Sequence, residues 1–361
     1  MMPEKNHTPP SEQSDKMPQK KQGLWTVVFI LIAVASIFAV VMQSREFSLS
    51  QFVAFVSEAS LPWLGVSFLS MLGFVVFEGV ALLIICRAFG YRRKLRRGFI
   101  YSASDIYFSA ITPSATGGQP ASAFFMMQDG VPGMVVTVAL VANLFMYTLS
   151  IIVIGLICVL FFGNLFADFD TVSKLLIVFG IVAQLGLALF FFLLLKSGRL
   201  LYRICRPVLH FLCKIRILRH EEEKQRRLLD AMEKYRGYAQ MLSGHRKTLF
   251  FVFLFNFLQR SSQIAVTMFT YLATGGDPAN AFSLFAMQGY VVLGSNSIPI
   301  PGAMGVSDYI MLDGFRTIMS ESAAVNLELL SRSVSFYFCI FLCGISTLIQ
   351  YQILKKRRTK K

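Results

Sequence analysis

Six long apolar runs constrain the fold of this chain more than any other feature. Each can supply the roughly 20 residues that cross a bilayer as a helix, so the chain is predicted to be an all-α integral membrane protein with about six transmembrane helices. No small-residue cleavage pattern follows the first run, which we interpret as a retained span and not a signal peptide. The runs are Leu24–Met42, Leu61–Cys86, Gly133–Phe162, Val172–Leu195, Leu249–Ala273 and Leu327–Leu354.

The composition agrees with this interpretation. Charged residues make up 15% of the chain and apolar residues 55%, whereas a soluble domain carries about 25% charged residues. The few charges are also unevenly placed. Thirty of the 35 Lys and Arg lie in segments 1–23, 87–97, 196–247 and 355–361, while the loops at the other span ends hold only Arg45.

Positive loops stay on the cytoplasmic side of a membrane. The distribution therefore predicts a multi-pass protein of the cytoplasmic (inner) membrane with both termini in the cytoplasm. It also accounts for the net charge of +15 without nucleic acid, which we do not expect as a partner. The predicted segments are a disordered cytoplasmic tail, a first membrane half, a linker of basic amphipathic helices, a second membrane half and a basic tail, with bounds 1–23, 24–195, 196–248, 249–354 and 355–361.

Two copies of one short pattern, Pro-x-Ala-x-Gly, interrupt apolar stretches of the two halves. They are Pro113–Gly117 and Pro301–Gly305, and each is followed by a hydrophobic run that ends in Asp-Gly. Proline and glycine break helices, and a broken helix at membrane depth needs protein or a water-filled cavity to satisfy its backbone. A matched pair of breaks in the two halves is typical of a transport site.

The positive-inside rule places each break within a re-entrant helical hairpin. Segment 98–132 must begin and end inside, and segment 281–320 must begin and end outside, which gives the two repeats inverted topology. Alternatively, residues 98–112 or 281–298 are full, short spans. That alternative changes the number of spans by pairs and leaves both termini cytoplasmic.

Ionisable residues inside a membrane are costly and mark functional sites. Three candidates lie within the spans: Glu78, Arg260 and Arg332. Arg260 lies about halfway along its span in a polar stretch, so it should face the bundle interior and suits a lipid phosphate. Alternatively, Glu78 is its structural counter-ion. Arg332 lies near enough to the outer surface to snorkel.

Polar and flexible residues at the two breaks complete the candidate lipid-binding set. Hydroxyls and backbone N–H groups at a half-helix N-terminus attract anions, although helix packing through small residues explains the glycines equally well. These further candidates are Pro113, Ser114, Thr116, Gly117, Gly118, Gln119, Pro301, Gly302, Gly305 and Asp308. We find no catalytic constellation, metal-ligand spacing or Gly-rich nucleotide loop, and expect no cofactor.

At these motifs the chain resembles the flippase-like family, also called the lysylphosphatidylglycerol synthase transmembrane region, which includes the membrane part of the multiple peptide resistance factor. The likeness covers about residues 25–355. Its residues are Thr112–Ala121, Pro299–Asp308, and Arg332 with Tyr337. The family often has Glu at position 119, Gly at 303 and Glu at 308, where this chain has Gln119, Ala303 and Asp308.

The resemblance implies a membrane protein that translocates or binds an anionic aminoacyl-phospholipid or a polyprenyl-linked lipid. The first alternative is a phosphatidylglycerol lysyltransferase or its membrane subunit. That activity resides in a separate cytoplasmic acyltransferase-like domain of the full-length synthases, and only Lys355–Lys361 follow the last span here. The second alternative is a non-transporting scaffold for lipid or glycan synthesis. The expected partners are membrane phospholipid and a separate synthase or glycosyltransferase subunit.

Overall fold

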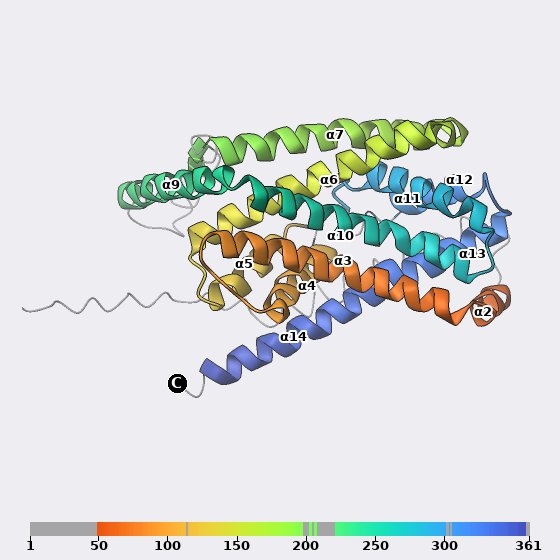
Figure 1. Cartoon of the computed structure of the whole chain (residues 1–361), viewed down its shortest axis with the longest axis horizontal. Coiled ribbons are helices and arrows are strands. Elements are labelled where there is room, and N and C mark those ends of the chain that lie inside the picture. The colour runs from red at the N-terminus through yellow and green to blue at the C-terminus, as the bar shows by residue number, and fades with distance from the viewer. Residues whose placement is uncertain are drawn as a thin grey trace, which may run out of the picture.

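The computed structural model describes residues 49–112, 115–197, 202–203, 206–207, 221–300, 303 and 305–358, and its secondary structure is helical (Figure 1). The first predicted span, Leu24–Met42, lies outside the described residues, as do the tail 1–23 and most of the first half of the basic linker. The helices are α2 (Leu49–Ser57), α3 (Leu61–Ala88), α4 (Leu95–Ile111), α5 (Gly118–Gln128), α6 (Gly133–Asp168), α7 (Thr171–Lys196), α9 (Glu221–Gly244), α10 (Arg246–Ala273), α11 (Ala281–Ser295), α12 (Val306–Phe315), α13 (Glu321–Arg332) and α14 (Cys339–Arg358).

The other five predicted spans are confirmed as helices long and apolar enough to cross a membrane. They are α3, α6, α7, α10 and the continuous run Glu321–Lys356, in which a π-helical segment, Ser333–Phe338, joins α13 to α14. The chain is therefore an all-α, multi-pass membrane protein. The largest differences from the predicted bounds are at α6, which extends to Asp168, and at α13, which already begins at Glu321. Ser320 caps α13 by accepting a hydrogen bond from the Ala323 N–H.

Helices α3 and α10 form an antiparallel pair at the centre of the bundle (Figure 1). The backbone N–H of Ser60, just before α3, donates to the carbonyl of Ala273 at the end of α10 over 2.7 Å. Farther along, Ser67 Oγ lies 3.0 Å from Thr270 Oγ1. Small side chains at this interface let two long helices approach closely and pair their polar groups.

A pair of shorter helices leaves each end of this central pair. Helices α4 and α5 lie between the end of α3 and the start of α6, and α11 and α12 lie between the end of α10 and the start of α13. Because α3 and α10 are antiparallel, the two short pairs start from opposite ends of the bundle (Figure 1). This arrangement is the one expected of inverted repeats.

The packing partners repeat in the same way. Helix α4 packs on α3, α5 and α14, while α11 packs on α10, α12, α7 and α6. One large apolar cluster surrounds α4 and α5 and includes Tyr101, Met126 and Val135. A second surrounds α11 and α12 and includes Tyr290, Leu293 and Phe315. Each short helix pair therefore lies in its own apolar core, and each core includes residues of both halves of the chain.

Helix α7 lies along one edge of the bundle (Figure 1) and buries only a narrow stripe, Ser173, Ile177, Gly180 and Gln184, with Leu194 near its end. Gly180 allows this contact, since a Cβ there would lie 1.8 Å from the carbonyl oxygen of Leu293 on α11. The rest of the helix exposes large apolar side chains such as Phe179 and Leu185. A surface of this kind suits lipid and not water.

Helix α9 packs beside α6, α7 and α10 and does not stand apart from the bundle. Tyr235 is fully buried, and its hydroxyl donates to the carbonyl of Leu194 over 3.2 Å. Burial raises the pKa of Tyr235 to about 12. The linker helix is thus anchored to the membrane half through its apolar stripe.

Candidate functional site

The two copies of the Pro-x-Ala-x-Gly pattern share a backbone conformation. The central alanine has a positive φ in both, 53° at Ala115 and 50° at Ala303. In both copies the next helix begins directly after the final glycine, with α5 at Gly118 and α12 at Val306. Non-glycine residues seldom adopt positive φ. The shared outlier therefore supports the sequence match between the two breaks.

The aspartate of each following Asp-Gly pair ties its short helix to a neighbour. Asp129 accepts a hydrogen bond from the Tyr101 hydroxyl over 2.6 Å and pairs with Arg97 at 3.3 Å. Asp313 accepts a hydrogen bond from the Asp170 N–H over 2.9 Å. The contact of Asp129 thus lies within the first half, whereas that of Asp313 joins the second half to the first.

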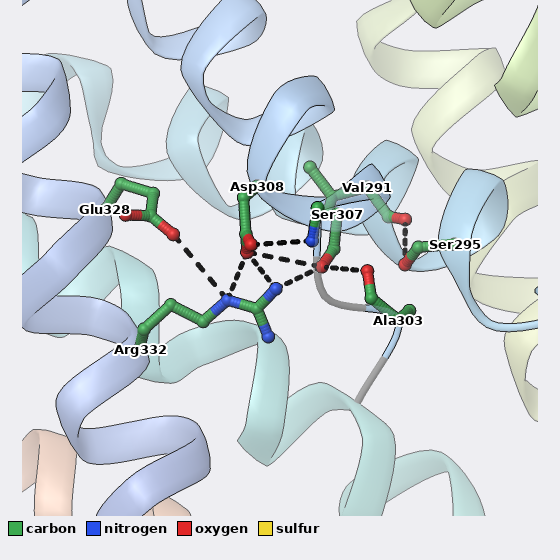
Figure 2. Close-up of polar contacts among 8 residues, drawn as sticks. Val291, Ser295, Ala303, Ser307, Asp308, Glu328 and Arg332 are labelled. Carbon is green, nitrogen blue, oxygen red and sulfur yellow. Dashed lines mark hydrogen bonds and ion pairs between the residues drawn. The ribbon is translucent and has the colours of Figure 1, made fainter. Parts of the chain in front are cut away.

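Beside the second break, Arg332 forms a compact ion cluster with residues of α12 (Figure 2). Its Nε donates to Asp308 Oδ1 over 2.6 Å, and its Nη2 contacts both Asp308 and Ser307. The second oxygen of Asp308 accepts the Gly305 N–H over 2.8 Å and so caps α12. Glu328, one turn before Arg332, lies 3.6 Å from its Nε.

The side chains of this ion cluster are largely buried. The side chain of Arg332 is 12% exposed and that of Asp308 only 3%. The snorkelling alternative for Arg332 is therefore not what the structure shows, because its guanidinium turns inward to a carboxylate. Glu328 is completely buried, and neither of its carboxyl oxygens has a hydrogen-bond partner among the described residues.

At the first break, the groups predicted to attract an anion are bound to the chain itself. The Gly117 N–H donates to Thr112 Oγ1 over 2.8 Å, and the Gln119 side-chain amide donates to Asp105 Oδ2 over 2.6 Å. Asp105 Oδ1 accepts a hydrogen bond from Ser109. A Cβ at Gly118 would lie 2.0 Å from both Asp105 Oδ1 and Ser109 Oγ. The glycine therefore allows Asp105 to reach the start of α5.

Glu78 on α3 lies next to this group and interacts with Asp105. Its Oε2 accepts hydrogen bonds from Ser102 Oγ over 2.9 Å and from Gln259 Nε2 over 3.0 Å. Glu78 and Asp105 are each 6% exposed. Two buried carboxyl groups, from adjacent helices, thus share one network of neutral donors.

Arg260 is the residue after Gln259 on α10 and is 5% exposed. Its guanidinium donates to Gln263 Oε1 and, over 3.3 Å, to Asn296 Oδ1 just beyond α11. It also lies over the rings of Tyr147, at 4.5 Å, and Phe74, at 5.8 Å. Among the described residues, no carboxylate pairs with Arg260 within 4.0 Å, and its Nε has no hydrogen-bond partner.

The two breaks are therefore connected through one turn of α10. Gln259 reaches the Glu78 and Asp105 pair that holds Gln119 of the first break. Arg260 reaches Asn296 at the start of the second, and Asn296 also accepts from the Tyr147 hydroxyl over 2.7 Å. Glu78 influences Arg260 through space, although the amide of Gln259 and not the guanidinium binds its carboxyl group.

The structure brings most of the predicted site residues into these two groups. Glu78, Gly117, Gly118, Gln119 and Arg260 belong to the first, and Gly305, Asp308 and Arg332 to the second, while Thr116 is exposed at the first break. Pro113, Ser114, Pro301 and Gly302 lie outside the described residues. A cavity of about 280 Å³ lies at the end of α10, lined by residues such as Tyr271, Thr274 and Leu327 and by none of the predicted site residues.

The candidate set drawn from the sequence omitted several residues of these groups. Gln259 was visible as a polar residue next to Arg260, Asn296 as a polar residue shortly before the second break, and Asp105 as an acid before the first break. Tyr147 and Ser102 carry no sequence signal, since both are ordinary in an apolar helix. Glu328 did carry a sequence signal, because it precedes Arg332 by four residues and therefore lies on the same helix face.

One protein family matches the chain. The family described as Lysylphosphatidylglycerol synthase TM region matches residues 25–343. The chain belongs to this family. Searches of curated proteins and of solved structures returned no match. The family connects this multi-pass membrane protein with lipid metabolism and with membrane lipids as partners.

Proposed function

We propose that this family member moves a phosphate-bearing membrane lipid between the two leaflets, with Arg260 binding the phosphate. The observation that carries the proposal is the state of Arg260. A buried cation loses several kcal/mol of hydration, which a well-placed anion normally offsets. Arg260 has amide and aromatic neighbours but no paired carboxylate among the described residues.

The geometry around Arg260 suits a lipid phosphate. A guanidinium presents its N–H donors in a planar fork that matches two phosphate oxygens. No described residue binds the Nε of Arg260, and the acceptors for its two Nη atoms are neutral amide oxygens. Neutral acceptors hold the fork in place without cancelling its charge. An incoming phosphate would then gain a charge-assisted hydrogen bond.

The short helix pairs support transport over simple binding. In the proposal they are re-entrant hairpins that enter from opposite sides of the membrane, and both approach the turn of α10 that carries Gln259 and Arg260. Sites formed by broken elements of inverted repeats are a common basis of alternating access. The lipid would be an aminoacyl-phospholipid or a polyprenyl-linked lipid, which share the phosphate that Arg260 recognises.

Lipid translocation by the purified chain tests this function. The probe is phosphatidylglycerol with a fluorescent acyl chain in phosphatidylethanolamine and phosphatidylglycerol vesicles, and a reagent that reaches only the outer leaflet quenches it. We expect Arg260→Gln to slow translocation by at least about tenfold, which corresponds to about 1.4 kcal/mol of lost charge-assisted bonding. Arg260→Lys should retain more activity because it keeps the charge.

Arg316→Gln is the matched control. Arg316 pairs with Glu321 at 2.8 Å, its side chain is 37% exposed, and it lies between α12 and α13. We expect this variant to translocate the probe like the wild type. Failure of the wild type to exceed protein-free vesicles, or equal rates for Arg260→Gln and the wild type, would reject the proposal. Transfer of radiolabelled lysine from tRNA to phosphatidylglycerol would instead favour the lysyltransferase alternative.

A further inference from the structure

We propose that Glu78 and Asp105 form a proton-binding site that couples lipid movement to a transmembrane proton gradient. The inference rests on the proposed function and specifies its energy source. The ligand is a single proton from the aqueous phase, which binds a carboxylate and makes it a neutral carboxylic acid.

The first support is the contact between the two acids. Glu78 on α3 and Asp105 on α4 are both buried, and their carboxyl groups interact with each other. Two ionised carboxylates in contact repel strongly where the dielectric constant is low. An ionised carboxylate also has no hydrogen to donate. One proton on the pair would remove this repulsion and supply the hydrogen for a bond between the two groups.

The second support is the set of side chains around the pair. Ser102 and Gln259 donate to Glu78, while Ser109 and Gln119 donate to Asp105. Four neutral donors stabilise the ionised form as well, so the site can exist with and without the shared proton.

The third support is an unused acceptor on each glutamine. Gln259 is 2% exposed, and within the described part of the chain neither its Oε1 nor that of Gln119 has a hydrogen-bond partner. Unpaired carbonyl oxygens buried beside two acids are costly unless a donor reaches them. A protonated carboxyl group or a proton-carrying water supplies such a donor. Both oxygens thus point to a ligand that brings hydrogen.

The charged and titratable groups that face the pair explain the coupling. Helix α10 contributes Arg260, which acts on Glu78 through space, and α14 contributes the thiol of Cys343. Arg260 is therefore the cation that favours the ionised acids. When a lipid phosphate binds Arg260, its charge is neutralised and the pair takes up a proton. By reciprocity, a proton on the pair favours lipid binding at Arg260.

The pair is also connected to the first break, because Gln119 at the start of α5 is held by Asp105. Protonation of Asp105 replaces a charge-assisted hydrogen bond with a weaker neutral one. The start of α5 is then less firmly held to α4. Proton binding would in this way loosen the start of α5 at the first break. Lipid binding would act on Arg260 and, through Asn296, on the second break.

Vesicles with an imposed pH gradient test the coupling with the same fluorescent phosphatidylglycerol. We expect the gradient to shift the leaflet ratio of the probe at least about fivefold in the wild type, the lower end of typical coupling between two sites. Glu78→Gln and Asp105→Asn should move the probe to equal leaflet occupancy whatever the gradient. Glu58→Gln, an exposed acid after α2, is the control and should respond like the wild type.

The outcomes separate this inference from the proposed function. A wild type that translocates the probe but ignores the gradient overturns proton coupling and leaves lipid translocation intact, as does a Glu78→Gln protein that still responds. If the wild type does not translocate, infrared difference spectroscopy of the purified protein decides whether the pair binds a proton. We expect a carboxylic acid carbonyl band that titrates between about pH 5 and about pH 9 and is lost in both variants. Absence of that band overturns the site.

Discussion

The two buried arginines of this protein have the same kinds of neighbour in different arrangements. Arg332 lies near the buried acids Asp308 and Glu328, and Arg260 lies near the buried Glu78, which in turn interacts with Asp105. Arg332 touches its carboxylates directly. Arg260 donates to the amide oxygens of Gln263 and Asn296 instead. The side-chain amide of Gln259 donates to Glu78, the acid near Arg260.

In our proposal, this difference separates a structural ion cluster at Arg332 from a ligand site at Arg260. In the first arrangement the charges satisfy one another, and the cluster fixes α12 against α13. In the second, a cation and two acids remain individually available, one for an anion and the others for a proton. Equal composition therefore does not imply equal function. What matters is whether neutral groups keep the opposite charges apart.

The two breaks show the same divergence on a common backbone. Ala115 and Ala303 share their left-handed conformation, yet the acids beside them have different partners. Asp105 accepts a hydrogen bond from Gln119, whereas Asp308 forms an ion pair with Arg332 of the last span. The same backbone conformation thus occurs beside two different polar groups, one with a paired arginine (Arg332) and one whose arginine (Arg260) has no paired carboxylate among the described residues.

The largest expected effect is on stability at the Arg332 ion cluster. Arg332→Gln or Asp308→Asn should each lower the free energy of unfolding by about 3–5 kcal/mol, because each strands a buried charge. Arg260→Gln should cost less than about 1 kcal/mol, since it strands no paired carboxylate. Thermal unfolding in detergent measures both. The double variant Asp308→Asn with Arg332→Gln should recover part of the loss, and equal losses at Arg260 and Arg332 would contradict the comparison.

A smaller effect is expected where Gly118 meets Asp105. Gly118→Ala should destabilise by about 1–3 kcal/mol, the usual cost of overpacking, because its Cβ would overlap Asp105 and Ser109. The matched control is Gly186→Ala on α7, where no atom lies within 4 Å of an added Cβ. That change should stabilise by about 0.5–1 kcal/mol, since alanine favours the helix. The melting temperatures should move in opposite directions, and a harmless Gly118→Ala would show that Asp105 is not held as described.

The smallest effect concerns the exposed end of α12, the helix that carries Asp308. Tyr309 donates a hydrogen bond to Asp170. Partial desolvation opposes ionisation of Asp170, but the bonds from Tyr309 and from the Ser173 N–H lower its pKa overall. The bond to Asp170 and then burial raise the pKa of Tyr309 to about 12. Tyr309→Phe should therefore cost at most about 1 kcal/mol at neutral pH, as expected for an exposed pair.

The directions of the two pKa shifts predict the pH range in which Tyr309→Phe lowers the stability. The folded pKa of Asp170 is lowered, so its stabilisation is present above the unfolded value of about 3.9 and disappears as the pH falls through the folded value. The folded pKa of Tyr309 is raised, so its stabilisation is present below about 10 and disappears as the pH rises through about 12. Melting temperatures of wild type and Tyr309→Phe should converge at both extremes, and a constant difference would show that the bond does not form.

Several features of the protein follow from the sequence alone. Run length and hydropathy predicted α3, α6, α7, α10 and the α13–α14 run, because crossing a bilayer needs only a local stretch of apolar residues. The two Pro-x-Ala-x-Gly copies predicted where helices break, because proline and glycine act on the backbone wherever they occur. The motifs also predicted the family, which the match over residues 25–343 confirms.

The partners of the charged residues were decided only by the tertiary structure. The sequence distinguished Arg260 from Arg332 only by position along the span, and it did not show which carboxylate either arginine meets. Asp308 meets Arg332 across 24 residues, and Gln259 meets Glu78 across 181. Those contacts depend on how the helices pack, including the approach of α5 to α4 that Gly118 permits. Hydropathy sets which segments enter the membrane, whereas packing sets which charges neutralise one another there.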